Sequence, residues 1–308
     1  MKKHYLYAAI AIFGWSTVAT VVKLLLGTMN SIQVLSISAL FASLFLLVVG
    51  LTTGQIKTFK TYVPKDYLIS VLISIPGTFF YYVFCYMGTS CMLASQAFIV
   101  NYLWPIMSVV FACIILKEKL TLVKAIALLL SFIGVIVTVG NDILAFEWNT
   151  LFGAVLCALG AVCYGIFTAL NQKFKYEKPN TMMLGFFASF IITSCISIPL
   201  YGLPYLNLGQ TIGILWNGIV TIGIANTLWQ MAIESGDTVK ISNLAYITPV
   251  LSMVWTSLIL KEPISVWSVI GLSIIMLGIL IQLWAGKKKL DTLLTYNRFE
   301  YSMSRALN

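Results

Sequence analysis

The sequence predicts an all-α membrane protein with ten transmembrane helices, arranged as two inverted five-helix repeats. Three observations lead to this fold class: an extremely apolar composition, a repeated segment and an uneven distribution of lysines. Of the 308 residues, 60% are hydrophobic and 9% are charged, and the mean hydropathy is +0.95. A soluble domain needs charged side chains at roughly a quarter of its positions. The composition therefore excludes a soluble globular protein and indicates a chain that lies in lipid.

Apolar runs long enough to cross a bilayer, which takes about 20 residues in a helix, occur along the whole chain. The first five are expected at 5–26, 31–51, 67–88, 91–116 and 122–140. The second five are expected at 150–170, 181–203, 210–233, 242–260 and 264–285. The runs divide the chain into a first repeat over 1–140, a second repeat over 150–285, and a polar cytoplasmic tail over 286–308.

One segment of the first half returns about 144 residues later. Residues 105–121 read PIMSVVFACIILKEKLT, and residues 249–265 read PVLSMVWTSLILKEPIS. The proline, a serine and the closing Leu-Lys-Glu coincide, while the positions between them stay apolar. If each repeat holds five spans, an odd number, the second copy enters the bilayer upside down relative to the first. Inverted repeats of this kind are typical of membrane transporters.

The lysines fall mostly on one side of the expected topology. With the amino terminus inside, the outer side receives only Lys261 and Lys23. Cytoplasmic loops carry an excess of Lys and Arg, so both termini are predicted to be cytoplasmic. The lysines on the cytoplasmic side are Lys57, Lys60, Lys65, Lys117, Lys119, Lys124, Lys173, Lys175, Lys178, Lys240 and Lys287 to Lys289.

Formal charge is absent from the middle of the expected spans. Lys23 is the exception, and it lies close enough to the end of its span for the side chain to reach the interface. Proton-driven pumps usually keep a carboxylate or a histidine at membrane depth, and the single histidine here is His4. We therefore expect transport that is not coupled to protons.

The fourth span carries an amide and a proline near its middle. Burying the Asn101 amide without a partner would cost about 2–7 kcal/mol, so it either bonds a neighbouring helix or faces a polar cavity. Pro105 and Pro249 each remove a backbone donor and are expected to kink their helices. A tyrosine, Tyr102 or Tyr246, lies three residues before each proline. Broken helices mark transporter binding sites, although prolines also occur in ordinary membrane helices.

Many aromatic residues lie too deep in the expected spans to form an interfacial belt. These rings either pack in the core or line a cavity that stacks on a flat apolar solute. Amides on the second half, such as Asn226, would orient an uncharged or zwitterionic ligand. The candidate substrate-binding residues are Trp15, Tyr81, Tyr82, Asn101, Tyr102, Trp104, Tyr164, Asn226, Trp229 and Tyr246.

Other functional classes lack support in the sequence. The net charge of +9 is spread over short loops, so no nucleic-acid partner is expected. The six cysteines lie in apolar runs without Cys-x-x-Cys pairs, and we predict small buried apolar side chains rather than disulfides or metal ligands. Neither Gly-x-Ser-x-Gly nor His-Glu-x-x-His occurs, so we predict no enzyme and no cofactor. A channel would need a continuous polar stripe or a charged ring, and the sequence indicates neither.

These motifs resemble the drug/metabolite transporter superfamily, in its ten-helix branch built from two EamA-type repeats. The resemblance covers most of the chain and is carried by Gly14-Trp15-Ser16, by the Pro-to-Leu-x-Glu segments at 105–118 and 249–262, and by Asn171-Gln172-Lys173. The fourth-span stretch Val100-Asn101-Tyr102-Leu103-Trp104-Pro105 is similar to bacterial exporters of aromatic amino acids.

We expect a monomer in the bacterial inner membrane, with a small molecule as its substrate. The resemblance implies export of aromatic and other neutral amino acids by alternating access through a central cavity. Transport of cationic drugs or nucleosides by the same fold is the alternative. The cavity residues that the resemblance implies are Trp15, Asn101, Tyr102, Trp104, Trp229 and Tyr246.

Overall fold

The computed structural model describes residues 3–140, 145, 147–174, 176–236, 241 and 244–281, so the expected tail at 286–308 lies outside the described residues. Within these ranges the chain is helical and contains no strand. The first half forms α1 (Lys3–Ser16), α2 (Val18–Leu26), α3 (Ser31–Thr53), η1 (Gln55–Thr61), α4 (Pro64–Ile75), η2 (Pro76–Phe80), α5 (Tyr81–Cys91), α6 (Ala94–Asn101), α7 (Trp104–Ile115) and α8 (Leu122–Thr138). The second half forms α10 (Trp148–Lys173), α11 (Lys178–Tyr201), α12 (Leu208–Leu215), η3 (Trp216–Ile224), α13 (Ala225–Ser235), α15 (Ile247–Leu260) and the helix Val266–Ile281.

Seven helical stretches among the described residues are long and apolar enough to cross a membrane. Three shorter apolar helices take the places of the expected fifth, ninth and tenth spans: Leu122–Thr138, Ile247–Leu260 and Val266–Ile281. The all-α membrane class predicted from the composition is therefore confirmed. The seven long stretches are Lys3–Leu26, Ser31–Thr53, Pro64–Cys91, Ala94–Ile115, Trp148–Lys173, Lys178–Tyr201 and Leu208–Ser235.

Large apolar side chains cover the outside of the bundle. Leu122, Leu203 and Val266, for example, are 76%, 79% and 71% exposed. Small hydroxyl residues such as Ser38 and Ser189 are instead fully buried between helices. An outer surface of this kind is unfavourable in water and favourable in lipid, whereas buried small residues let helices approach closely.

Several of the spans are interrupted, each for a local reason. Thr17 separates α1 from α2, and its hydroxyl donates to the carbonyl of Gly14 at 2.7 Å. α6 ends at Asn101 and α7 begins at Trp104, beside Pro105, which has no N–H to continue the helix. The third span of each half contains a π-helical stretch, η2 in the first and η3 in the second. Such stretches are rare and often lie at functional sites.

The two halves exchange contacts in matching pairs. α1 of the first half packs against α13 and α15 of the second, and α10 of the second half packs against α5 and α7 of the first. α3 packs against α11, its counterpart in the second half. Glycines permit the close approach: a Cβ added to Gly88 on α5 would lie 2.7 Å from the carbonyl oxygen of Gly153 on α10. Each half is therefore held by the other.

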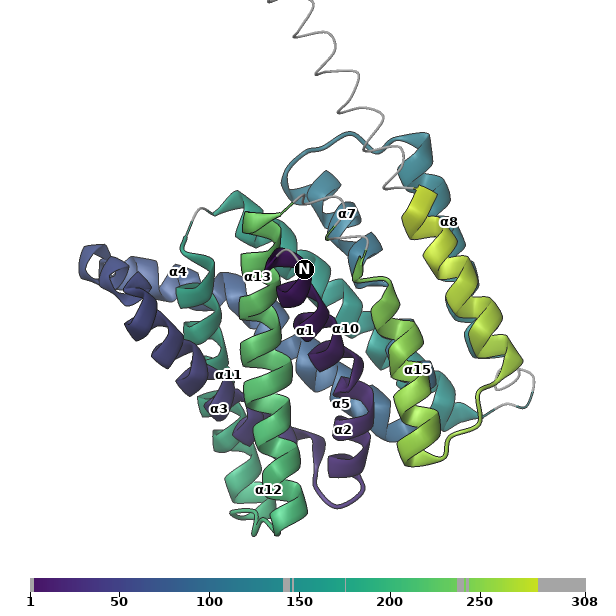
Figure 1. The fold of residues 1–308 in the computed structure, drawn as a ribbon, viewed down its shortest axis with the longest axis horizontal. Coiled ribbons are helices and arrows are strands. Elements are labelled where there is room, and N and C mark those ends of the chain that lie inside the picture. Colours follow the sequence, from purple (N-terminus) through teal and green to yellow (C-terminus); the bar gives the residue numbers. More distant parts are fainter. Residues whose placement is uncertain are drawn as a thin grey trace, which may run out of the picture.

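The repeated sequence segments end with the same backbone geometry. Lys117 and Lys261 both have a φ of 58°, which is rare outside glycine, and they are the only such non-glycine residues described. The next residue donates its N–H to a carbonyl six positions earlier in both copies, Glu118 to Ala112 and Glu262 to Thr256, each at 3.4 Å. Figure 1 shows the loops after α7 and after α15 at opposite ends of the molecule.

Candidate substrate pathway

A cavity of about 300 Å³ lies at the centre of the bundle. Its wall is formed by the interrupted helices: α1 and α2 around Thr17, η2 with α5, the junction of α6 and α7, and η3 with α13. α10, α11 and the start of α15 complete it. The aromatic side chains that line it are Trp15, Tyr81, Tyr82, Phe98, Tyr102, Trp104, Tyr164, Phe167, Phe186 and Trp229.

Every predicted substrate-binding residue except Tyr246 lines this cavity. Tyr246 instead packs against a core cluster that includes Tyr102 and Met253. Two residues close to Tyr246 in the sequence, Ala245 and Thr248, do line the cavity. The sequence pattern placed Tyr246 correctly at a helix break, but the direction of its side chain depends on how the helix is rotated.

The rings of the wall contact one another in two groups. Ring centroids lie 5.2 Å apart for Trp15 and Trp229 on opposite halves. On the other side of the cavity, Tyr164 lies 4.9 Å from Tyr81 and 5.1 Å from Trp104. These tilted and edge-to-face arrangements are the ones that aromatic pairs prefer, so the rings fix each other's orientation.

Asn101 is held by side chains at the edge of the cavity. Its Nδ2 donates to the hydroxyl of Tyr81 at 2.9 Å, and its Oδ1 accepts from the Sγ of Cys85 at 3.2 Å. The side chain is 9% exposed. The sequence left two possibilities for the Asn101 amide, a bond to a neighbouring helix or a position facing a cavity. Both apply, because the amide is hydrogen-bonded within the protein and also forms part of the cavity wall.

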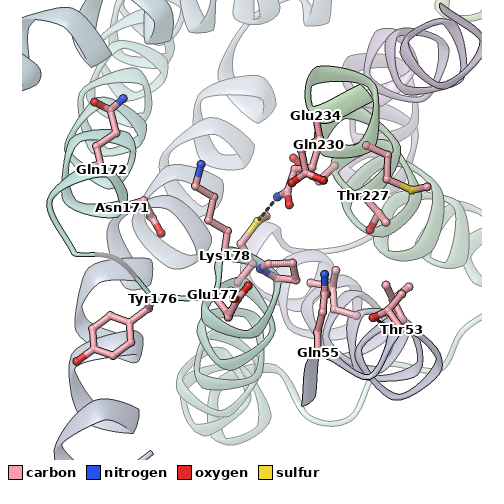
Figure 2. A pocket seen from close by; sticks show the side chains of 16 residues that line it. Thr53, Gln55, Asn171, Gln172, Tyr176, Glu177, Lys178, Thr227, Gln230 and Glu234 are labelled. Carbon is pink, nitrogen blue, oxygen red and sulfur yellow. Dashed lines mark hydrogen bonds between the residues drawn. The ribbon is translucent and has the colours of Figure 1, made fainter. Parts of the chain in front are cut away.

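A second and wider pocket, of about 610 Å³, adjoins the central cavity. We call it the vestibule. Figure 2 shows it between α10, α11 and α13, with Lys178 extending into it between Asn171 and Gln230. The vestibule and the cavity share six lining residues: Asn171, Gln172, Lys178, Met182, Asn226 and Gln230. The two spaces therefore form one pathway that opens beside η1 and the start of α11.

Lys178 was missed as a site residue because the sequence places it in a loop. It is the first residue of α11, and among the residues that the structure describes it is the only formally charged one that lines the central cavity. Two further charges, Glu177 and Glu234, line the vestibule alone. The distribution of charge along the expected spans had suggested a cavity without formal charge. Lys178 shows that the cavity wall does carry a charge.

Two asparagines present acceptor atoms to the pathway. Asn171 and Asn226 each donate their Nδ2 to the carbonyl four residues earlier, of Phe167 at 2.9 Å and of Ile222 at 2.7 Å. Their Oδ1 atoms receive no hydrogen bond from any residue that the structure describes. Since both residues line the cavity, these oxygens are available to a donor group of a solute.

Away from the vestibule the pathway narrows to a chamber of about 30 Å³, which we call the closed end. Tyr81, Tyr82 and Asn101 line both the chamber and the central cavity. Thr89 and Val22 line its far side. One water molecule needs about 10–15 Å³ of cavity volume, so the chamber holds only a few waters and a metabolite cannot pass here without movement of the helices.

The cysteines correct part of the sequence interpretation. All six are free. However, only Cys85 and Cys157 are buried, while Cys195 is exposed on the apolar outer surface. Among the described residues, no group of three or more His, Cys, Asp or Glu side chains is placed to hold a metal ion.

Comparison with known proteins identifies the family. Residues 2–140 and 151–284 each match the EamA-like transporter family. An uncharacterized transporter from Archaeoglobus fulgidus is 26% identical over 297 residues, covering 91% of this chain and 98% of the relative. The aromatic amino acid exporter YddG of Salmonella typhimurium is 24% identical over 290 residues, covering 86% of this chain and 91% of the exporter.

A second YddG, from Ancylobacter novellus, is 25% identical over 181 residues, covering 58% of this chain and 63% of that exporter. A solved crystal structure superposes with a TM-score of 0.67 at 20% sequence identity, covering 92% of this chain and 98% of the other. This likeness supports the same overall fold.

Proposed function

This chain belongs to the EamA-like transporter family, and from that premise we propose that it exports aromatic and other neutral amino acids from the cytoplasm. The observation that carries the proposal is the ring-lined cavity of about 300 Å³, which continues into the vestibule. This volume lies in the range of about 300–1,000 Å³ typical of small-molecule sites. Aromatic walls bind a flat apolar side chain by stacking and by burial of apolar area.

The polar groups of the pathway suit the two charges of an amino acid. The Lys178 ammonium is available to the carboxylate, and the Oδ1 atoms of Asn171 and Asn226 are available to the ammonium group. Charge-assisted hydrogen bonds of this kind are roughly twice as strong as neutral ones. The ring of the solute would then lie against Trp104 and Tyr164.

Alternating access is the mechanism that we propose, with the two halves rocking around the cavity. The matching contacts between the halves and the opposite positions of the loops after α7 and α15 support an inverted pair of five-helix repeats, 1–140 and 150–285. The helix breaks at Pro105 and Pro249 would act as flexible points. With both termini and the tail over 286–308 in the cytoplasm, the vestibule faces the side from which an exporter is loaded.

A flux screen tests the proposed substrate class. Purified protein in liposomes should transport tryptophan and phenylalanine, threonine more slowly, and methyl viologen or a nucleoside not at all. Lys178→Met should raise the KM for tryptophan, with little effect on an analogue that lacks the carboxylate, such as tryptamine. Lys173→Met is the matched control, because Lys173 lines neither pocket. If none of the tested amino acids is transported, the proposal is refuted.

Transport of cationic drugs or nucleosides is the second candidate function. It is favoured by the same rings, whose faces attract cations, and by Glu177 and Glu234 at the vestibule. Uptake of methyl viologen that exceeds tryptophan flux, and that falls in Glu234→Gln, would establish this alternative in place of amino-acid export.

The energy source is tested separately. Since no acidic residue or histidine lines the central cavity among the described residues, we propose efflux driven by the gradient of the solute itself. Tryptophan efflux from proteoliposomes should therefore continue at an unchanged rate when an ionophore collapses the pH gradient. A fall to the rate of protein-free liposomes would show proton coupling and contradict this part of the proposal.

A further inference from the structure

A buried carboxylate lies at the closed end of the pathway. Glu262, in the loop after α15, is 9% exposed and accepts three hydrogen bonds from the start of α6. The donors are the backbone N–H of Ala94 at 2.8 Å, the backbone N–H of Ser95 at 3.1 Å and the hydroxyl of Ser95 at 3.0 Å. A residue of the second half therefore caps a helix of the first half.

A lysine binds the same turn from the other side. Lys23, in the last turn of α2, donates its ammonium to the carbonyl of Thr89 at 2.7 Å and of Met92 at 2.6 Å, where α5 ends. This side chain was expected to reach the interface, and in the structure it binds carbonyls at the end of the third span. Each charge thus meets the helix end that attracts it: the ammonium at the carbonyl end of α5 and the carboxylate at the N–H end of α6.

These interactions join three parts of the chain around the turn between α5 and α6. We call them the closing contact, made by Lys23 and Glu262 on Thr89, Met92, Ala94 and Ser95. Thr89 also lines the narrow chamber, so the closing contact lies directly over the closed end. Opening this end requires α2, the α5–α6 turn and the loop after α15 to separate.

The repeat supplies a glutamate that is not bound in this way. Glu118 holds the equivalent position in the first half and shares the backbone geometry of Glu262. Its side chain is 50% exposed and pairs with Lys124 at 2.9 Å, on the surface. Two equivalent glutamates are therefore in different environments. The engaged one is at the closed end, and the exposed one follows α7 at the opposite end of the molecule (Figure 1).

We propose that Glu262 and Lys23 are positioning residues that hold the end of the pathway opposite the vestibule shut, and that release of the closing contact opens it. The inference rests on the proposed transport function, since an opening at this end is needed only if a solute crosses. Neither residue lines the central cavity, so their role is to set the balance between the two open states.

Thiol labelling tests this inference without any substrate. Cys85 is a native reporter, because it lines the 30 Å³ chamber and is 9% exposed. In a background where the other five cysteines are alanine, labelling of Cys85 by a maleimide should be slow. Glu262→Gln and Lys23→Met should each speed it by about tenfold or more, because lost hydrogen bonds to a charged group shift a two-state equilibrium by at least that factor.

A reporter in the vestibule separates gate opening from unfolding. Thr227→Cys, with Cys85 also replaced, should label more slowly when Glu262 or Lys23 is changed, because the vestibule closes as the other end opens. Glu118→Gln and Lys124→Met are matched controls from the exposed pair, and they should leave Cys85 labelling slow.

Unchanged Cys85 labelling in both variants would overturn the inference. Faster labelling at both reporters would also overturn it, since that result means general loosening of the fold. Because no solute is involved, these outcomes are independent of whether amino acids are the substrate.

Discussion

At the scale of single residues, the cavity is shaped by rings that orient one another. Trp104 is central to this arrangement, because its ring lies 5.1 Å from that of Tyr164 and 6.4 Å from that of Tyr102. Trp104 is also the first residue of α7, beside the helix break. Its side chain therefore combines a surface for the solute with the position where the fourth span bends.

We predict that Trp104→Ala weakens transport without preventing membrane insertion. The KM for tryptophan should rise about threefold to tenfold, since an aromatic pair contributes about 0.5–1.5 kcal/mol. Trp267→Ala is the control, because Trp267 is 45% exposed on the outer surface and lines neither pocket. Equal tryptophan KM values for the two variants, measured in liposomes, would show that Trp104 does not line the path.

The sequence identified residues of the cavity wall where depth within a span was informative. Trp15 and Trp229 lie inside their apolar spans rather than at the ends, so we expected both rings to lie in the core or in a cavity wall. Lys178 and Tyr246 show the limit. Whether a residue at a helix end points into a cavity depends on helix rotation and on partners distant in sequence, which one chain does not encode locally.

At the scale of elements, glycines on α10 decide how closely the halves approach. A Cβ added to Gly165 would lie 2.6 Å from the carbonyl carbon of Met107 on α7, a backbone atom that cannot move independently of its helix. The π-helical stretches η2 and η3 lie at equivalent places in the two halves and help to form the cavity wall. A single proline or glycine does not specify such a stretch, so the sequence did not predict it.

We predict that Gly165→Ala destabilises the protein by forcing α7 and α10 apart. Overpacking of this kind costs about 1–3 kcal/mol, and the midpoint of thermal unfolding in detergent should fall by about 2 °C or more. Gly140→Ala serves as the control, since a Cβ there meets no atom within 4 Å. A midpoint equal to that of the control would contradict the packing derived for this helix pair.

At the scale of the whole molecule, the two halves support each other through exchanged contacts. α1 packs against α13 and α15 of the second half, and α10 packs against α5 and α7 of the first half. These helices hold equivalent places in the two halves, so exchanging the halves gives the same set of helix contacts. The all-helical membrane class followed from the composition, which is too poor in charge for a soluble domain, and from apolar runs long enough for spanning helices. The exchange of helices did not follow, because apolar spans of similar length carry little information about which of them pack together.

The central claim is that the two repeats have opposite orientations across the membrane, and sided labelling tests it most directly. Leu120→Cys and Ile264→Cys occupy equivalent positions after the two Leu-Lys-Glu segments and are exposed. In intact cells carrying a cysteine-free background, a membrane-impermeant maleimide should label Ile264→Cys directly and Leu120→Cys only after permeabilisation. Labelling of both positions from the same side would contradict the inverted architecture and the transport mechanism built on it.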